Sequence, residues 1–85
     1  MASYSLHVKT SVSKDLRSIP KKDVKRILAW IKKLANDPRP AGCEKLLDRE
    51  IYQIRQGRYR ILYEIQDRAL IVLVIKVGSR DSVYG

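Results

Sequence analysis

The chain has 85 residues, of which 18 are Lys or Arg and 9 are Asp or Glu, so its formal net charge is +9. This length allows one small domain over residues 1–85, and a hydrophobic fraction of 45% is too high for a disordered chain. A single cysteine excludes an internal disulfide, no apolar run approaches the ~20 residues of a membrane span, and the first residues are too polar for a signal peptide.

We therefore expect a cytoplasmic domain whose excess positive charge attracts a polyanion. Nucleic acid is the first candidate for this partner, an anionic membrane surface the second and an acidic protein the third. The alternative is a basic surface that is only solvated.

The N-terminal half predicts one strand followed by two helices. Tyr4, Leu6 and Val8 alternate with polar residues, which is typical of a strand. Apolar residues at positions 12, 16 and 19 follow the helical period, and Pro20 ends this helix and begins the next. Residues 21–36 predict the clearest helix, because its apolar side chains fall on one face and its cations on the other. A short turn between two helices indicates a helical hairpin.

The C-terminal half predicts three strands. A proline-containing loop follows the second helix, and residues 44–47 are expected to form a helical turn. The strands are Ile51–Arg55, Tyr59–Gln66 and Leu70–Val77, separated by tight turns at Gln56-Gly57 and Asp67-Arg68. The order β-α-α-β-β-β predicts an α+β fold in which the helical hairpin packs on one face of a small, mainly antiparallel sheet. The last strand is apolar on both faces, so we expect it in the interior of the sheet.

Alternation along the strands assigns side chains to the two faces of this sheet. We expect Tyr52, Ile54, Tyr59, Ile61, Tyr63 and Ile65 to face the helices, and Gln53, Arg55, Arg58, Arg60, Leu62 and Glu64 to face away. Arg55, Arg58, Arg60, Lys76 and Arg80 then converge on the open face, with Tyr84 arriving from the tail. Arginine binds phosphate oxygens through two parallel hydrogen bonds, and tyrosine stacks on a base or exchanges a proton. The pattern favours single-stranded RNA as the ligand, although arginines also keep exposed strands soluble.

The ordered set of motifs from residue 46 to residue 84 resembles the RelE/ParE superfamily of bacterial toxins. It consists of Tyr52-Gln-Ile-Arg55, Gly57-Arg-Tyr-Arg60, the apolar strand over 70–77, Val77-Gly-Ser-Arg80 and Val83-Tyr84. The resemblance implies a RelE-like, microbial-RNase-like fold. It also implies that the chain is the toxin of a toxin–antitoxin module, with a cognate antitoxin as its partner.

RelE-type members cleave mRNA in the A site of the 70S ribosome without a metal or other cofactor. The resemblance assigns Arg55 to one basic position of their site, Arg60 to the strand arginine, Arg80 to the arginine after the last strand and Tyr84 to the C-terminal tyrosine. Gln53 stands where RelE-type toxins carry another basic residue. On this reading Arg60 and Arg80 stabilise the phosphate, Tyr84 stacks on a base or takes a proton, and Arg55 positions the backbone.

The remaining polar side chains are assigned to RNA binding. They are Gln53, Arg58 and Lys76 beside the site, and Lys22, Lys25, Arg26, Lys32 and Lys33 on the second helix, which alternatively form a solvated face. Two other functions stay open. The first is a ParE-like inhibitor of DNA gyrase that cuts no RNA, because a glutamine cannot act as a base. The second is a non-enzymatic nucleic-acid-binding module, which the charge alone supports.

Overall fold

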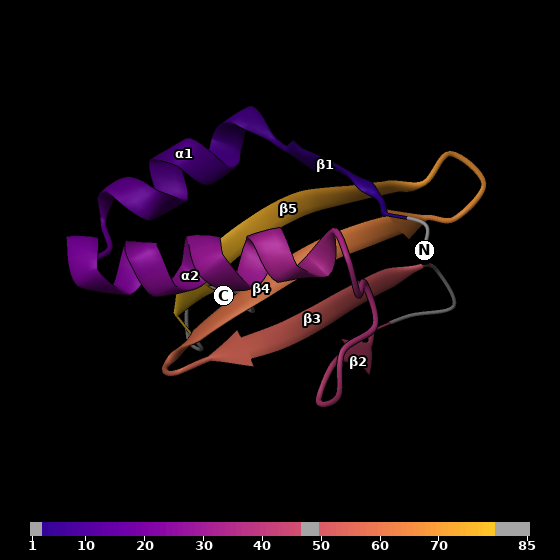
Figure 1. The fold of residues 1–85 in the computed structure, drawn as a ribbon. Helices are drawn as coiled ribbons and strands as arrows, with labels where there is room; N and C mark the ends of the chain where they lie inside the picture. The colour runs from indigo at the N-terminus through magenta and orange to yellow at the C-terminus, as the bar shows by residue number, and fades with distance from the viewer. Residues whose placement is uncertain (1–2, 47–49, 80–85) are drawn as a thin grey trace.

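Figure 1 shows the protein, as a computed structural model, with two helices packed against a five-stranded sheet. The structure describes residues 3–46 and 50–79. The strands are β1 (Ser5–Val8), β2 (Glu44–Lys45), β3 (Ile51–Gln56), β4 (Tyr59–Gln66) and β5 (Ile71–Ser79), and the helices are α1 (Thr10–Arg17) and α2 (Lys21–Leu34). The predicted α+β fold class is confirmed. Within the described ranges, no helix is long and apolar enough to cross a membrane.

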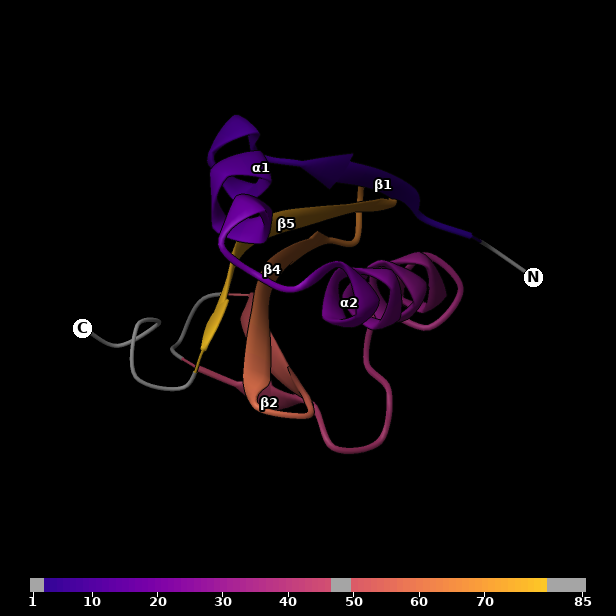
Figure 2. The same ribbon diagram turned by 90° about the vertical axis from the view of Figure 1, so that its left-hand side faces the viewer.

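The sheet has the strand order β1-β5-β4-β3-β2. β1 pairs with β5 in parallel and the other three pairs are antiparallel, so the sheet is mainly antiparallel, as expected. β5 has a neighbour on both sides, which agrees with the interior position that its apolar sequence predicts. The first and last strands of the fold therefore lie side by side (Figure 2).

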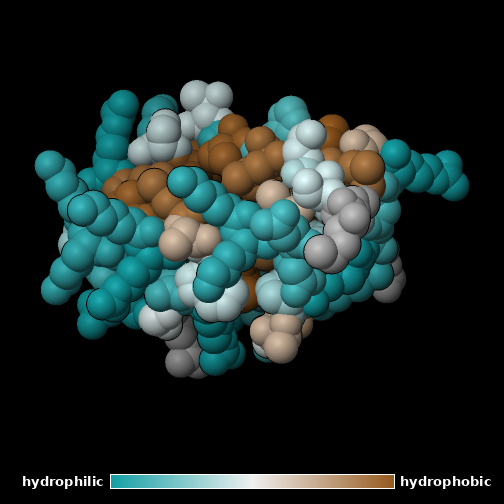
Figure 3. Space-filling model, viewed as in Figure 1, coloured by the Kyte–Doolittle hydropathy of each residue, from teal (hydrophilic) through white to brown (hydrophobic). Residues whose placement is uncertain are grey.

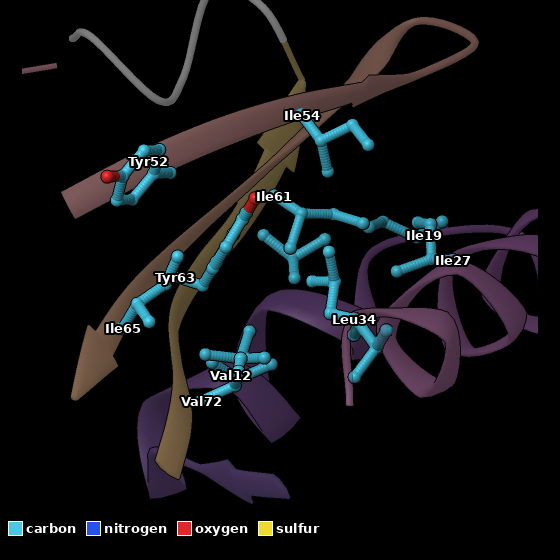
Figure 4. Close-up of a cluster of buried hydrophobic side chains, with 13 residues drawn as sticks. Val12, Ile19, Ile27, Leu34, Tyr52, Ile54, Ile61, Tyr63, Ile65 and Val72 are labelled. Carbon is cyan, nitrogen blue, oxygen red and sulfur yellow. The ribbon is translucent and has the colours of Figure 1, made fainter. Parts of the chain in front are cut away.

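The hydrophobic core lies between the helical hairpin and one face of the sheet (Figures 2 and 4). The hairpin contributes Val12, Ile19, Ile27, Ile31 and Leu34, and the sheet contributes Tyr52, Ile54, Ile61, Tyr63, Ile65, Val72, Val74 and Val77. The inward side chains of β3 and β4 are those that alternation predicted. Leu28 is an exception on α2, since it is 42% exposed although it belongs to the apolar stripe. The apolar face of α2 is thus wider than its contact with the sheet.

Three local predictions for the C-terminal half are wrong. Glu44–Lys45 are not part of a helical turn, because they pair with β3 as strand β2. The turn between β3 and β4 falls at Gly57-Arg58, because Gln56 still pairs with Tyr59 and Gly57, with φ of 61°, takes the first central position of the two-residue loop. β5 begins one residue later than expected, because Leu70 adopts a left-handed φ of 54°.

A β-bulge opposite the step from Leu62 to Tyr63 decides which side chains of β5 face the core. Tyr63 pairs with Val74, whereas Leu62 pairs with Lys76, so β5 contains one extra residue at this point. Without the bulge, the alternation that buries Val74 would also bury Lys76. With it, Val77 enters the core and Lys76 lies on the open face of the sheet, as predicted.

Ion pairs and hydrogen bonds connect the loop between α2 and β2 to the sheet. The Arg39 guanidinium forms ion pairs with Asp67 at 2.8 Å and with Glu50 at 3.2 Å, and the Tyr52 hydroxyl donates to Glu50 at 2.7 Å. The hydrogen bond from Arg39 lowers the pKa of Asp67 to about 2, and the hydrogen bond from Tyr52 lowers the pKa of Glu50. This cluster lies at the end of the sheet opposite the β3–β4 turn, away from the arginines of the hairpin end.

Candidate nucleic-acid interface

Three arginines surround a depression at the end of the β3–β4 hairpin. Arg55 and Arg60 are cross-strand partners, and Arg58 lies in the turn between the strands. The depression has a volume of about 250 Å³ and is also lined by Gly57 and Tyr59. Arg55 and Arg58 are exposed, whereas Arg60 is only 6% exposed. Like charges directly opposite each other on a sheet repel, so an anion seated here would offset that repulsion.

Gln53 and Lys76 lie on the same face of the sheet as this pair, because both are register partners of Leu62. Lys76 is half-buried. Gln53 is 3% exposed, and its Nε2 donates to the Glu44 carboxylate at 3.0 Å. Gln53 and Arg60 therefore occupy the predicted face, but they are buried rather than open to solvent. Gln53 contacts β2, the strand that the sequence did not predict, through its hydrogen bond to Glu44.

The cations of α2 lie in the helical layer, away from the open face of the sheet. They are the exposed side chains Lys22, Lys25, Arg26, Lys32 and Lys33. Arg26 adjoins the hairpin end, because it lines a depression of about 210 Å³ together with Arg58. At ~1.5 Å of rise per residue, Lys33 is more than ~10 Å farther along the helix, and its ammonium lies 4.9 Å from the centre of the Trp30 ring. The predicted RNA-binding residues thus fall into separate groups.

Tyr59 connects the sheet with α2. Its side chain packs against the core, and its hydroxyl donates to Oδ2 of Asp23 at 3.2 Å. Burial, together with this hydrogen bond, raises the pKa of Tyr59. The phenol is therefore protonated at neutral pH and is not a base. Sequence reasoning placed Tyr59 in the core and missed its position at the interface, since the contact with Asp23 joins residues 36 positions apart.

Arg58 and Tyr59 line each of the three depressions at this end of the molecule, and Arg58 is the cation that they share. A third depression, of about 360 Å³, lies where the C-terminal end of α1 meets the end of β5. It is lined by Arg58, Lys76 and Asp15, among others. The sequence placed Arg58 on a strand facing away from the helices. Its position in the turn instead lets it border the open face of the sheet and both helices.

Arg80 and Tyr84, the other two residues assigned to catalysis, lie outside the described residues. The last described residues of β5 are Gly78 and Ser79, which pair with Arg60 and Tyr59. The described part of β5 therefore ends beside the arginine depression, directly before Arg80 in the chain.

An apolar groove of about 530 Å³ runs between α1 and α2. Its lining includes the apolar side chains of Leu16 and Val24 and the cations Arg17, Lys21 and Lys25. Figure 3 shows the corresponding apolar band over the helical layer, bordered by hydrophilic residues.

Residues 6–84 match the family of the ParE toxin of type II toxin–antitoxin systems, parDE. The chain belongs to this family. Toxin RelG of Mycobacterium tuberculosis is 32% identical to this ParE-family chain over 89 residues, and the match covers 95% of each. The putative toxin RelE1 of Methanocaldococcus jannaschii is 25% identical over 85 residues, covering 95% of this chain and 94% of the relative. The resemblance to the RelE/ParE superfamily is confirmed, and the ParE-family chain is a RelE-like toxin of a type II toxin–antitoxin system.

Solved structures give the same fold. The toxin–antitoxin complex RelBE2 from Mycobacterium tuberculosis contains a chain with a TM-score of 0.80 at 23% identity, covering 92% of this chain and 99% of that chain. Isolated E. coli RelE has a TM-score of 0.79 at 23% identity, and the match covers 96% of this chain and 92% of that chain. The RelB–RelE complex from Methanococcus jannaschii contains a chain with a TM-score of 0.74 at 25% identity, and the match covers 92% of this chain and 94% of that chain. The ParE-family chain therefore has the RelE fold.

Proposed function

We propose that this toxin is a ribosome-dependent endoribonuclease that inhibits translation by cutting mRNA in the ribosomal A site. The observation that carries the proposal is the convergence of Arg55, Arg58 and Arg60 at one end of the sheet, where β5 leads into Arg80. Three guanidinium groups around one depression suit the phosphate oxygens of an RNA backbone. The net charge of +9 and the similarity to toxins named RelG and RelE1 support the same function.

The reaction joins the 2′-oxygen of one nucleotide to the neighbouring phosphorus and breaks the bond from that phosphorus to the 5′-oxygen. The 2′-hydroxyl proton passes to a base, cations stabilise the charge of the phosphorane, and an acid protonates the departing 5′-oxygen. Arg60 and Arg80 hold the phosphate oxygens, Arg80 also protonates the 5′-oxygen, and Arg55 positions the backbone. Tyr84 stacks on a base or takes the 2′-hydroxyl proton. These groups do the chemistry without a metal or other cofactor.

The cations outside this catalytic group bind RNA. Arg58 contacts the strand as it leaves the arginine depression, because Arg58 borders the depressions toward Arg26 and toward Lys76. Gln53, which is buried and donates to Glu44, lies beneath this RNA-binding face rather than on it. The other cations of α2, which are Lys22, Lys25, Lys32 and Lys33, dock on ribosomal RNA, where charge supplies affinity but no sequence information.

The partner that restrains the toxin is a cognate antitoxin. The toxin–antitoxin complexes RelBE2 of Mycobacterium tuberculosis and RelB–RelE of Methanococcus jannaschii contain chains with this fold, which supports such a partner. An acidic antitoxin segment complements the net charge of this chain. Binding blocks the arginine depression or the approach to the ribosome.

A second function is inhibition of DNA gyrase by binding, without RNA cleavage. Two observations favour it. The family that matches residues 6–84 is that of the ParE toxin. In addition, Gln53, at a position where RelE-type toxins carry a basic residue, is buried against Glu44.

Cell-free translation with the purified protein separates the two functions. The 5′ ends of the mRNA are mapped by primer extension, with ribosomes present and absent. We expect cuts that appear only with ribosomes, vanish in Arg80→Ala and weaken in Tyr84→Phe. The control Arg17→Ala removes a cation from α1, away from the arginine depression, and should cut normally. Intact mRNA with continuing translation would exclude the endoribonuclease, and a supercoiling assay with purified DNA gyrase would then test the second function.

A further inference from the structure

The N-terminal segment covers the edge of β5 that faces away from β4, first with β1 and then with α1. β1 pairs with residues 71–74 of β5, and the backbone N–H of Lys9 then donates to the carbonyl oxygen of Val74 at 3.0 Å. Farther along the same strand, the backbone N–H of Val77 donates to Oδ2 of Asp15 in α1 at 3.2 Å. Pairing between β1 and β5 therefore stops at Val74, and a carboxylate from α1 replaces it at Val77.

This contact lies next to the proposed catalytic groups. Val77 is 1% exposed, and it is followed by Gly78, the cross-strand partner of Arg60. Arg80 comes three residues after Val77 in the chain. A shift of Val77 would carry Gly78 with it and would change how β5 meets Arg60.

The charge of Asp15 is unfavourable for RNA binding at this place. Asp15 lines the same depression as Arg58 and Lys76, the two cations assigned to the RNA backbone. A carboxylate here repels phosphate and partly neutralises both cations. Direct contact with RNA therefore does not explain an acidic side chain at this site. The hydrogen bond that Asp15 accepts from β5 does.

We propose that Asp15 is a positioning residue for RNA cleavage, which acts by holding the end of β5 through the Val77 N–H. The inference rests on the proposed endoribonuclease function. Two properties of Asp15 then act in opposite directions. The acceptor oxygen favours the bond-breaking step, and the negative charge weakens RNA binding.

Two substitutions separate these properties. Asp15→Asn keeps an acceptor oxygen and removes the charge, whereas Asp15→Leu removes both and keeps the same branched arrangement of heavy atoms. The measurement is single-turnover cleavage of mRNA on ribosomes, giving a saturating rate and a half-saturating toxin concentration. Asp15→Asn should keep the saturating rate within about threefold and lower the half-saturating concentration. Asp15→Leu should lower the saturating rate by roughly 10- to 100-fold without weakening binding, because a small displacement of catalytic groups costs this much.

Two further measurements distinguish positioning from general destabilisation. Thermal melting gives the folded fraction, and the fall in rate for Asp15→Leu should exceed any loss of folded protein. Amide hydrogen exchange at Val77 should be faster in Asp15→Leu and unchanged in Asp15→Asn. The matched control is Asp37→Leu. Asp37 accepts a backbone N–H from Arg39 at 3.3 Å in the loop after α2, and its loss should leave the saturating rate unchanged.

The outcomes distinguish this inference from the proposed function. A wild-type protein that cuts no mRNA on ribosomes refutes the proposed function, and the role of Asp15 in cleavage with it. A wild-type protein that cuts, together with an Asp15→Leu variant that cuts equally fast, refutes the positioning role alone. Equal slowing by Asp15→Asn and Asp15→Leu also overturns it, because the charge rather than the hydrogen bond would then matter.

Discussion

Replacing Arg55 and Arg58 with glutamine should flatten the salt dependence of RNA binding. Both guanidinium groups are exposed and line one depression, so we assign one phosphate contact to each. For single strands, the slope of log K against log salt is about −0.7 for each phosphate neutralised, so losing two contacts reduces its magnitude by about 1.4. Between about 50 and 200 mM salt, a fourfold change, the wild-type affinity should then fall roughly sevenfold more than that of the variant.

The assay is fluorescence anisotropy at several salt concentrations, with a short single-stranded RNA whose 2′-hydroxyls are methylated to prevent cleavage. The control is the double substitution Lys32→Gln and Lys33→Gln, which makes the same change in net charge near the C-terminal end of α2. Its slope should match that of the wild-type protein. An unchanged slope in the arginine variant would refute the phosphate contacts. Equal flattening in both variants would show that overall charge, rather than the arginine depression, drives binding.

Three further predictions concern stability. Tyr63→Phe removes a buried hydroxyl that donates to the carbonyl oxygen of Pro38 at 2.7 Å. Urea titration should show a loss of about 1–3 kcal/mol in the free energy of unfolding. A loss within experimental error would contradict this contribution of the hydrogen bond. Leu70→Gly relieves a left-handed φ of 54° and should stabilise the protein by up to about 1 kcal/mol in thermal melting, whereas a lower Tm would disprove the strain. Because the pKa of Asp67 is about 2 in the folded protein, below its ordinary value, its ion pair with Arg39 stabilises the fold above about pH 4 and is lost as the pH falls toward about 2. Melting curves of Asp67→Asn should accordingly show a weaker decline in acid, and an unaltered pH profile would count against this account.

The faces of β3 and β4 were predictable from the sequence, because side chains alternate along a strand whatever its partners are. Tyr52, Ile61 and Tyr63 are in the core, and Arg55 and Arg60 share the opposite face. The degree of burial was not predictable. Gln53 is 3% exposed and donates to Glu44 of β2, a strand of two residues that has too few side chains to produce a recognisable pattern.

The candidate site was predictable only in part, because several of its features depend on register. A count of two residues per period puts Arg58 on β4, but the turn residue Gly57 moves it to the tip of the hairpin. Lys76 lies on the predicted face, but it does so through a bulge that the sequence did not predict, since strict alternation from Val74 would bury it. Arg80 and Tyr84 were assigned from the family resemblance and remain predictions.

The sequence by itself determined the helical hairpin, the three principal C-terminal strands, the net charge of +9 and the family. The helices and strands follow from the spacing of apolar and polar side chains along the chain. The net charge is a sum over all residues, and the family follows from the ordered motifs. Only the tertiary structure decided that Arg55, Arg58 and Arg60 share one depression and that Asp15 binds the backbone of Val77. Such contacts depend on strand pairing and on how α1 lies against β5. No local pattern records them, because the Asp15–Val77 contact joins residues 62 positions apart.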